Sequence, residues 1–347
     1  MRLSRRRLLT GFAAIAGAGA PVGAAAIEAR SVVIAARPIP SFEPRSPEKR
    51  RFGELNFRSG LILRGDHDRF GGFSGLWRSA DGRELVALND RGFWLTARPD
   101  YREGRLFDLK DAAIAPILGA SGQPLSRSRY YDTEALTIVD GVAYVGVERA
   151  HSVLRFDWGR DGVRARAKPV PVPPEVAKLP RNQGLEAIGV VPAGHPLSGR
   201  VVAIAERSGK EDEPTRGFIL GLKNGLFEVV RHDGFDITDM AFLPGGDLVL
   251  LERWYRPLRG VGLRIRRIAG AELKPGARLD GPYLLSADLG QEIDNMEGMA
   301  VHLDQGAHGA DPDLGRQLLL PAADDPAGVR AGSLARRHCE RSEAIQP

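Results

Sequence analysis

Short apolar runs occur in pairs along the chain, and a turn-forming segment separates the two runs of each pair. The second runs consist mostly of β-branched residues or leucine and lie at 84–88, 142–147, 201–205 and 248–251. Asp140-Gly141 and Gly245-Gly246 separate two of the pairs, and these residue types tolerate the positive φ of tight hairpin turns. The pattern therefore predicts a series of β-hairpins.

One motif opens and closes these hairpins, and it recurs five times at intervals of 52 to 60 residues. The opening segments lie at 73–76, 133–136, 185–188, 238–241 and 296–299. The closing segments, the first four of which end in an acid followed by arginine, lie at 88–91, 146–149, 204–207, 250–253 and 323–325. A period of this length is typical of solenoids, propellers and arrays. Because the repeating units are hairpins, we expect an all-β propeller.

The segments between the hairpins predict outer strands, at 152–158, 217–222, 226–231 and 262–268. Residues 31–64 add at least two more, at 32–36 and 54–64, which either complete the last blade or build another. We therefore expect five or six blades in one domain at 27–326, with an incomplete closing blade at the C-terminal end.

The two ends of the chain differ from this body. Residues 1–26 carry Ser4-Arg5-Arg6-Arg7, an Ala/Gly-rich run and Ala24-Ala25-Ala26, which predicts a twin-arginine signal peptide and a periplasmic or secreted protein. The run is too rich in Gly and Ala for a convincing membrane span, although an uncleaved anchor is the alternative. Residues 327–347 lack strand periodicity, and either an aberrant tail that replaces the last strand or a natural disordered tail explains them.

Charge is concentrated at these ends. The formal net charge is +5, of which residues 1–26 contribute four arginines without an acid and residues 327–347 contribute four arginines and two glutamates. Subtracting +4 and +2 leaves −1 for the body. A basic nucleic-acid-binding surface is therefore not expected. Cys339 is the only cysteine, so neither an intrachain disulfide nor a cysteine metal site is possible.

Hairpin geometry predicts where the acids of the motif meet. Because the start of one strand and the end of its partner lie at the same edge, Glu134 should lie beside Glu148 and Glu186 beside Glu206. The fourth copy should place Thr238 or Asp239 beside Glu252. Radial repetition brings such edges together around one channel mouth, with arginines between the acids, at Arg91, Arg149, Arg207 and Arg253.

These carboxylates would repel one another without a cation, so we expect the opening acids Glu134, Glu186 and Glu297 to face the channel and act in function. The arginines have an alternative interpretation, as partners in ion pairs that tie neighbouring blades together.

The order of several segments resembles the phytase-like esterase family of exported bacterial proteins, over about residues 45–325. The segments that carry this resemblance are 73–76, 89–92, 132–136, 182–187, 239–244 and 294–298. The resemblance implies a propeller related to calcium-dependent phytases, with phosphoester hydrolase activity on a small-molecule substrate. The chain departs from the family pattern after Asp325, where a closing strand should follow.

The residues suit metal-assisted hydrolysis, because Ca²⁺ prefers oxygen ligands and a bound cation neutralises phosphate oxygens and holds a water for attack. The expected metal ligands are Asp90, Glu134, Glu148, Glu186, Glu206, Glu252 and Glu297, with Glu134, Glu186 and Glu297 as the catalytic set. The cationic residues expected to bind the substrate are Arg91, Arg149, Arg207, Lys210 and Arg253.

Two other functions fit a ring of carboxylates. A metal-dependent lactonase-like propeller would use the same ion on cyclic esters, and a non-catalytic periplasmic scaffold would only bind a partner. A serine hydrolase is disfavoured because the segment around Ser74 lacks the second glycine of a nucleophile elbow. Ser74 instead takes the place that glutamate has in other copies.

Overall fold

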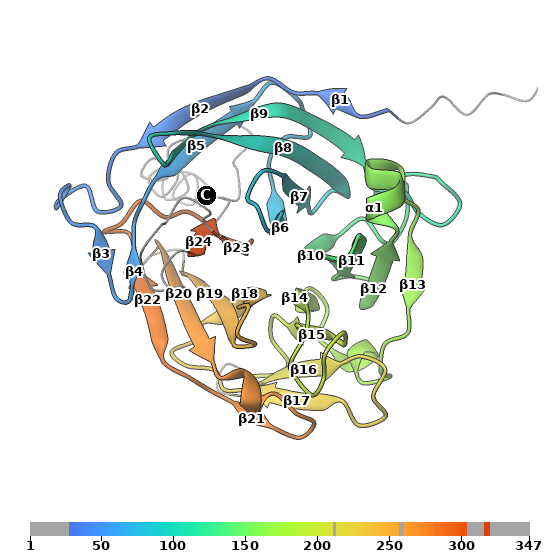
Figure 1. Ribbon diagram of the computed structural model, residues 1–347. Coiled ribbons are helices and arrows are strands. Elements are labelled where there is room, and N and C mark those ends of the chain that lie inside the picture. The colour runs from blue at the N-terminus through green and yellow to red at the C-terminus, as the bar shows by residue number, and fades with distance from the viewer. Residues whose placement is uncertain (1–27, 211–212, 257–259, 304–315, 320–347) are drawn as a thin grey trace, which may run out of the picture.

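The structure, a computed structural model, describes residues 28–210, 213–256, 260–303 and 316–319 and shows a ring of β-sheets around a central axis (Figure 1). The signal peptide predicted at 1–26 and the tail predicted at 327–347 lie outside these residues and remain predictions. The one α-helix in the described ranges is the short α1 (Trp158–Asp161). The four 3-10 helices of these ranges are η1 (Leu125–Arg127), η2 (Gly162–Arg164), η3 (Val176–Lys178) and η4 (Gly270–Glu272). Within the described chain, none of the helices has the length and apolar character needed to span a membrane.

Four sheets of four or five strands make up most of the ring, and the strands of each sheet follow one another from the centre outward. The first contains β6 (Phe73–Arg78), β7 (Leu85–Asn89), β8 (Phe93–Arg102), β9 (Arg105–Pro116) and β1 (Arg30–Ser31). The second contains β10 (Thr133–Val139), β11 (Val142–Val147), β12 (Ser152–Phe156) and β13 (Lys168–Val170). The third contains β14 (Leu185–Val190), β15 (Val201–Ala205), β16 (Thr215–Ile219), β17 (Leu226–Val229) and β21 (Arg278–Leu279). The fourth contains β18 (Asp236–Phe242), β19 (Leu248–Arg256), β20 (Gly260–Ile268) and β22 (Tyr283–Ala287).

A smaller pair of strands, β23 (Ala300–Leu303) and β24 (Arg316–Leu319), occupies the fifth position of the ring. The innermost strands contact one another in circular order, because β23 lies against both β18 and β6 while β10 and β14 complete the circle (Figure 1). The propeller prediction is therefore confirmed, but the blade count differs. The described residues form four complete sheets and a two-stranded fifth unit, where the prediction was five or six blades with an incomplete closing blade.

Hairpin chemistry accounts for the inner strands. Asp140 and Gly141 both have positive φ, at 49° and 72°, as the tight turn between β10 and β11 requires. The strands predicted at 142–147 and 201–205 coincide with β11 and β15. The long β8–β9 hairpin is absent from the sequence-based prediction. Its turn is formed by Glu103 and Gly104, which also have positive φ.

The cores of the molecule lie between successive sheets, which is why the inner strands are apolar on both faces. Between the first and second sheets, the fully buried Trp94 meets Phe156 edge-on with ring centroids 5.5 Å apart. Similar clusters separate the second from the third sheet and the third from the fourth. Burying one large aromatic side chain of this kind stabilises the fold by about 3 kcal/mol.

The segment from 28 to 65 lies along the outside of the ring. It contains β2 (Ile34–Ile39) paired with β5 (Gly60–Gly65), and β3 (Arg51–Phe52) paired with β4 (Leu55–Asn56). The first pair contacts β9, and residues around the second join the apolar cluster of the fourth sheet. The segment thus spans the outer side of the ring between the first and fourth sheets (Figure 1).

Polar contacts also join neighbouring inner strands. The Ser74 hydroxyl donates to the Thr133 carbonyl at 2.6 Å, and the Thr133 hydroxyl donates to the Asn89 carbonyl at 2.6 Å. The fully buried Asp239 carboxyl group accepts hydrogen bonds from the backbone N–H groups of Met240, at 2.7 Å, and Met299, at 2.6 Å. Asp239 therefore joins the fourth sheet to the chain that enters β23 and lies away from the other acids of the motif.

Candidate active site at the acidic edge of the ring

Each inner strand of the four complete sheets begins with a β-bulge. The register shifts lie between Phe73 and Gly75, Thr133 and Ala135, Leu185 and Ala187, and Ile237 and Asp239. The bulged residues at these shifts are Ser74, Glu134, Glu186 and Thr238. A bulge re-aims its side chain relative to the sheet. The same position of four sheets is thus re-aimed at one end of the ring, and two of the four residues are glutamates.

The structure brings the acids of the second and third sheets together, as predicted. The carboxylate oxygens of Asp132, Glu134 and Glu148 lie within 4.8 Å of one another. A second group, in which Glu186 and Glu206 join Glu148, is equally compact. Glu148 belongs to both groups because it directly follows β11, which pairs with β10 and also contacts β14. We call the six carboxylates at this end of the ring the acidic edge, comprising Asp132, Glu134, Glu148, Glu186, Glu206 and Glu297.

Crowding and burial act on these groups in the same direction. Burial, and then repulsion from Glu297 and Asp132, holds the pKa of Glu134 well above its ordinary value. Burial, and then repulsion from Glu134 and Glu206, does the same for the pKa of Glu186. Glu134 keeps some contact with solvent, but protein encloses it on most sides. Both groups are therefore costly to ionise until a positive charge compensates them.

Glu206 lies at the border of the acidic edge. Burial and the nearby Asp236 carboxylate raise its pKa to about 7, although Arg253 and Arg207 oppose the increase. Burial also raises the pKa of Glu148, against a hydrogen bond at 3.4 Å from the Gly184 N–H group.

Glu297 has a different environment from Glu134 and Glu186. Its Oε1 atom lies 3.0 Å from Nη1 of Arg253 and accepts a hydrogen bond of 2.6 Å from the Asn295 side-chain amide. Burial raises its pKa, while Arg253 and Asn295 lower it. Glu297 belongs to neither of the two compact carboxylate groups found among the described residues.

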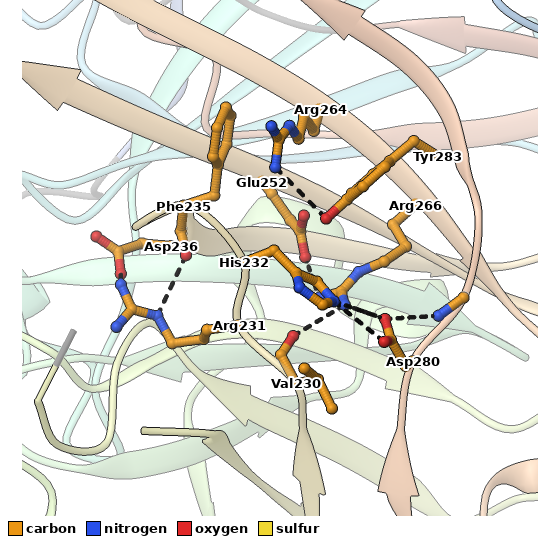
Figure 2. Close-up of polar contacts among 11 residues, drawn as sticks. Val230, Arg231, His232, Phe235, Asp236, Glu252, Arg264, Arg266, Asp280 and Tyr283 are labelled. Carbon is orange, nitrogen blue, oxygen red and sulfur yellow. Dashed lines mark hydrogen bonds and ion pairs between the residues drawn. The ribbon is translucent and has the colours of Figure 1, made fainter. Parts of the chain in front are cut away.

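Glu252 is not brought to the acidic edge, in contrast to the prediction. Figure 2 shows its carboxylate directed at the guanidinium group of Arg266, with which it forms a buried ion pair. Arg266 also donates hydrogen bonds of 2.8 Å to the Val230 carbonyl and to Asp280, whose carboxylate faces His232 (Figure 2). Glu252 therefore stabilises the contact between the third and fourth sheets.

The length of the hairpin turn explains the displacement of Glu252. The first three inner hairpins have unpaired turns with an even number of residues, at 80–83, 140–141 and 192–199. In the fourth hairpin Leu243 pairs with Asp247, which leaves the odd turn 244–246. One residue more or less in the turn shifts the register by one and reverses the faces of the strand. Glu252 thus pairs with Ile237, and Arg253 takes the position that an acid occupies in the other sheets.

The predicted substrate-binding cations have mainly structural contacts. Arg91 donates to the carbonyls of residues 68, 69 and 71, at 3.3, 3.4 and 2.9 Å, and Asp90 beside it has a side chain that is 52% exposed. Arg149 pairs with Asp132 at 2.7 Å, and Arg207 pairs with Asp236. Lys210 is exposed, and its backbone carbonyl accepts a hydrogen bond from Arg231. Of these three arginines, Arg207 ties neighbouring sheets together, whereas Arg91 and Arg149 contact residues of their own sheet.

Asp132 and Asn295 are site residues to which the sequence pattern assigns no role, although both lie in segments that carry the family resemblance. Each lies two positions before an opening glutamate, and each contacts the arginine that closes a hairpin. The spacing of an acid or amide two residues before Glu134 and Glu297 is the available signal. It is easily overlooked because both residues lie just outside the repeated segments.

Chemically, the acidic edge offers only oxygen ligands in its two compact groups, and these suit a hard divalent cation. No curated protein sequence matches this chain. Among solved structures, the crystal structure of the computationally designed Ika4 protein is similar to 53% of this chain, and the match covers 86% of the Ika4 chain with 15% sequence identity. The TM-score of this match is 0.25, which is too low to support a conclusion. The model of the phytase-like family, described as esterase-like activity of phytase, matches residues 68–311, which include the whole acidic edge, and this chain therefore belongs to the phytase-like family.

Proposed function

We propose that this chain is an exported phytase-like hydrolase that cleaves a phosphomonoester or a related ester at the acidic edge, with the help of Ca²⁺ or a similar divalent cation. Membership of the phytase-like family supports a hydrolase of small-molecule esters. The observation that carries the proposal is the pair of compact carboxylate groups that share Glu148.

The donor set fits a hard cation. All the ligand atoms in the two groups are carboxylate oxygens, and none comes from histidine or cysteine. Burial and mutual repulsion raise the pKa of both Glu134 and Glu186, so a divalent cation would relieve an existing electrostatic cost. Asp132, Glu134, Glu148, Glu186 and Glu206 are the residues that would hold it. When bound, such a cation neutralises phosphate oxygens and lowers the pKa of water.

The chain's own residues have distinct roles in this proposal. In the metal-free protein Glu206 has a pKa of about 7, so near neutral pH it should release its proton when the cation binds. Arg149 orients Asp132 through a hydrogen bond of 2.7 Å from its Nε atom. Its guanidinium side chain is 52% exposed and so remains available to an anionic substrate. Arg253 and Asn295 hold the Glu297 carboxylate in place, so in this proposal Glu297 fixes the Arg253 side chain at the acidic edge and does not bind the cation itself.

The direct test is a titration of the folded protein with Ca²⁺, Mg²⁺ and Mn²⁺ while the melting temperature is recorded. Binding to the folded state raises the melting temperature in proportion to the logarithm of the cation concentration. Glu134→Gln and Glu186→Gln should weaken the response. Glu84→Gln is the matched control, because this exposed acid lies at the turn end of the first hairpin. The absence of any shift at millimolar cation, with all three ions, would rule out the metal site.

Substrate profiling then distinguishes the reactions. Turnover of an aryl phosphate that depends on the added cation and is lost in Glu134→Gln supports the phosphoester hydrolase. Turnover of lactones without phosphatase activity would replace it with a lactonase. If neither ester class is hydrolysed while the cation still binds, the acidic edge serves binding and not catalysis.

A further inference from the structure

Arg253 occupies a position that is acidic in the other three complete sheets. In those three sheets the acids at this position are Asp90, Glu148 and Glu206, and the residue opposite each one lies two places before the bulged residue of the inner strand. The backbone N–H groups of the three acids donate to the carbonyls of these opposite residues, which are Gly72 at 3.1 Å, Asp132 at 2.9 Å and Gly184 at 2.8 Å. In the fourth sheet the corresponding residue, Asp236, pairs with Arg253. The odd turn at 244–246 has therefore replaced a carboxylate at this end of the ring by a guanidinium group.

The Arg253 side chain lies between carboxylates of the two flanking units. Its Nη1 atom is 3.0 Å from Oε1 of Glu297, and its Nη2 atom is 3.8 Å from Oε1 of Glu206. Arg253 also donates a hydrogen bond to the Asn295 side chain, which in turn donates to Glu297. The three charged side chains are only 18–20% exposed, so solvent screens their interaction less than at an open surface.

This arrangement divides the acidic edge into two unequal parts. On one side, Asp132, Glu134, Glu148, Glu186 and Glu206 belong to the compact carboxylate groups, and Arg149 pairs with Asp132 of its own sheet. On the other side, Glu297 is paired with Arg253 of the neighbouring sheet and belongs to neither group. A guanidinium group stays charged at every physiological pH, so the division is permanent.

We infer that Arg253 is a built-in cation that excludes a metal ion from the position between Glu206 and Glu297 and confines metal binding to the two compact carboxylate groups. Arg253 is thus a determinant of how many cations bind and where. The inference rests on the proposed function for the presence of a metal in the wild-type protein, but it concerns a separate property, the number and affinity of the ions.

The experiment measures Ca²⁺ binding by isothermal titration calorimetry, and the number of bound ions by native mass spectrometry, on the purified full chain. Arg253→Lys keeps the charge and should bind like the wild type. Arg253→Gln removes the charge and should bind Ca²⁺ roughly tenfold or more tightly, because a repelling charge near the ion is lost. Arg253→Glu restores the acid of the other sheets and should bind one additional ion. Arg267→Gln is the matched control, since this arginine of the same sheet pairs with Asp247 at the turn end of the fourth hairpin.

The outcomes separate the two hypotheses. If the wild type binds no Ca²⁺, the proposed function fails before Arg253 is tested. If the wild type binds Ca²⁺ but Arg253→Gln and Arg253→Glu bind it with unchanged number and affinity, Arg253 only ties the sheets together and the inference is wrong. If Arg253→Glu does not fold without Ca²⁺, the affinity of Arg253→Gln decides the question.

Discussion

Replacing Glu206 by glutamine should stabilise the metal-free protein, although such a change removes an ion pair. Glu206 has a pKa of about 7 in the folded chain, against 4.5 as its ordinary value, because burial and the Asp236 carboxylate disfavour its ionised form. Its side chain is only 18% exposed, so little of this effect is lost to solvent screening. The glutamine keeps the shape of the side chain and cannot ionise.

The sign and size of the effect follow from proton linkage. Between pH 4.5 and about 7 the folded state binds more protons than the unfolded state, so the free energy of unfolding falls as the pH rises through this range. Above about pH 7 the full cost applies, and the difference between the two pKa values corresponds to about 3 kcal/mol. This cost already includes the attraction between Glu206 and Arg253, and glutamine imitates the neutral carboxyl group, so we expect a net gain of about 1–3 kcal/mol for Glu206→Gln at about pH 8.5.

The assay is urea unfolding of both proteins in EDTA, followed by tryptophan fluorescence and circular dichroism, at about pH 4.5 and 8.5. The variant should be more stable only at the higher pH, and saturating Ca²⁺ should reverse the order, because the wild type then gains the ligand-binding energy. A variant that is less stable at the higher pH in EDTA, or a difference that does not depend on pH, would refute the electrostatic account of the acidic edge.

Three further changes test the structure around this site. Glu252→Ala should lower the free energy of unfolding in urea by about 3–5 kcal/mol, because it leaves the fully buried Arg266 without its principal counter-ion. The double variant Glu252→Leu with Arg266→Met removes both charges and should lower the free energy of unfolding by less than Glu252→Ala alone. Trp94→Ala should lower the free energy of unfolding by about 3–5 kcal/mol, because it leaves a cavity between the first two sheets. The Ca²⁺ affinity measured by calorimetry should stay unchanged. Asp239→Asn should lower the free energy of unfolding by about 1–3 kcal/mol at low pH in the same assay, because one of two buried backbone N–H groups, on Met240 or Met299, loses its acceptor. Burial holds the pKa of Asp239 well above its ordinary value, so the difference should shrink as the pH rises and the wild type bears the cost of ionising this group.

Much of the fold could be predicted from local chemistry. The period of the motif and turns such as Asp140-Gly141 specify hairpins, because the backbone of a tight turn requires positive φ at these residues. The β8–β9 hairpin escapes such a prediction because its outer portion is rich in charged residues and lacks a continuous apolar run. Glu103-Gly104 at its tip is the available signal. The proximity of Glu134 and Glu148 was also predictable, since it follows from two antiparallel strands joined by a two-residue turn.

The composition of the acidic edge depended on tertiary structure. Glu252-Arg253 has the same residue types as Glu148-Arg149. The three-residue turn at 244–246, however, shifts the strand register by one residue. Glu252 therefore points into the contact between the third and fourth sheets, and Arg253 points at Glu297. Similarity of residue types fixes neither register nor face, because side chains alternate along a strand and a one-residue shift exchanges the two faces.

The meeting of acids from different sheets was likewise beyond local chemistry. Glu148 joins Glu134 on one side and Glu186 on the other only because the ring places β11 against β14. Turns and strand alternation are local properties, so the order of residues alone specifies which hairpins form and which acids each one carries. Which of these acids share a site depends on the assembled ring, because only there do the distances between sheets exist, and with them the burial and repulsion that raise the pKa of Glu134 and Glu186.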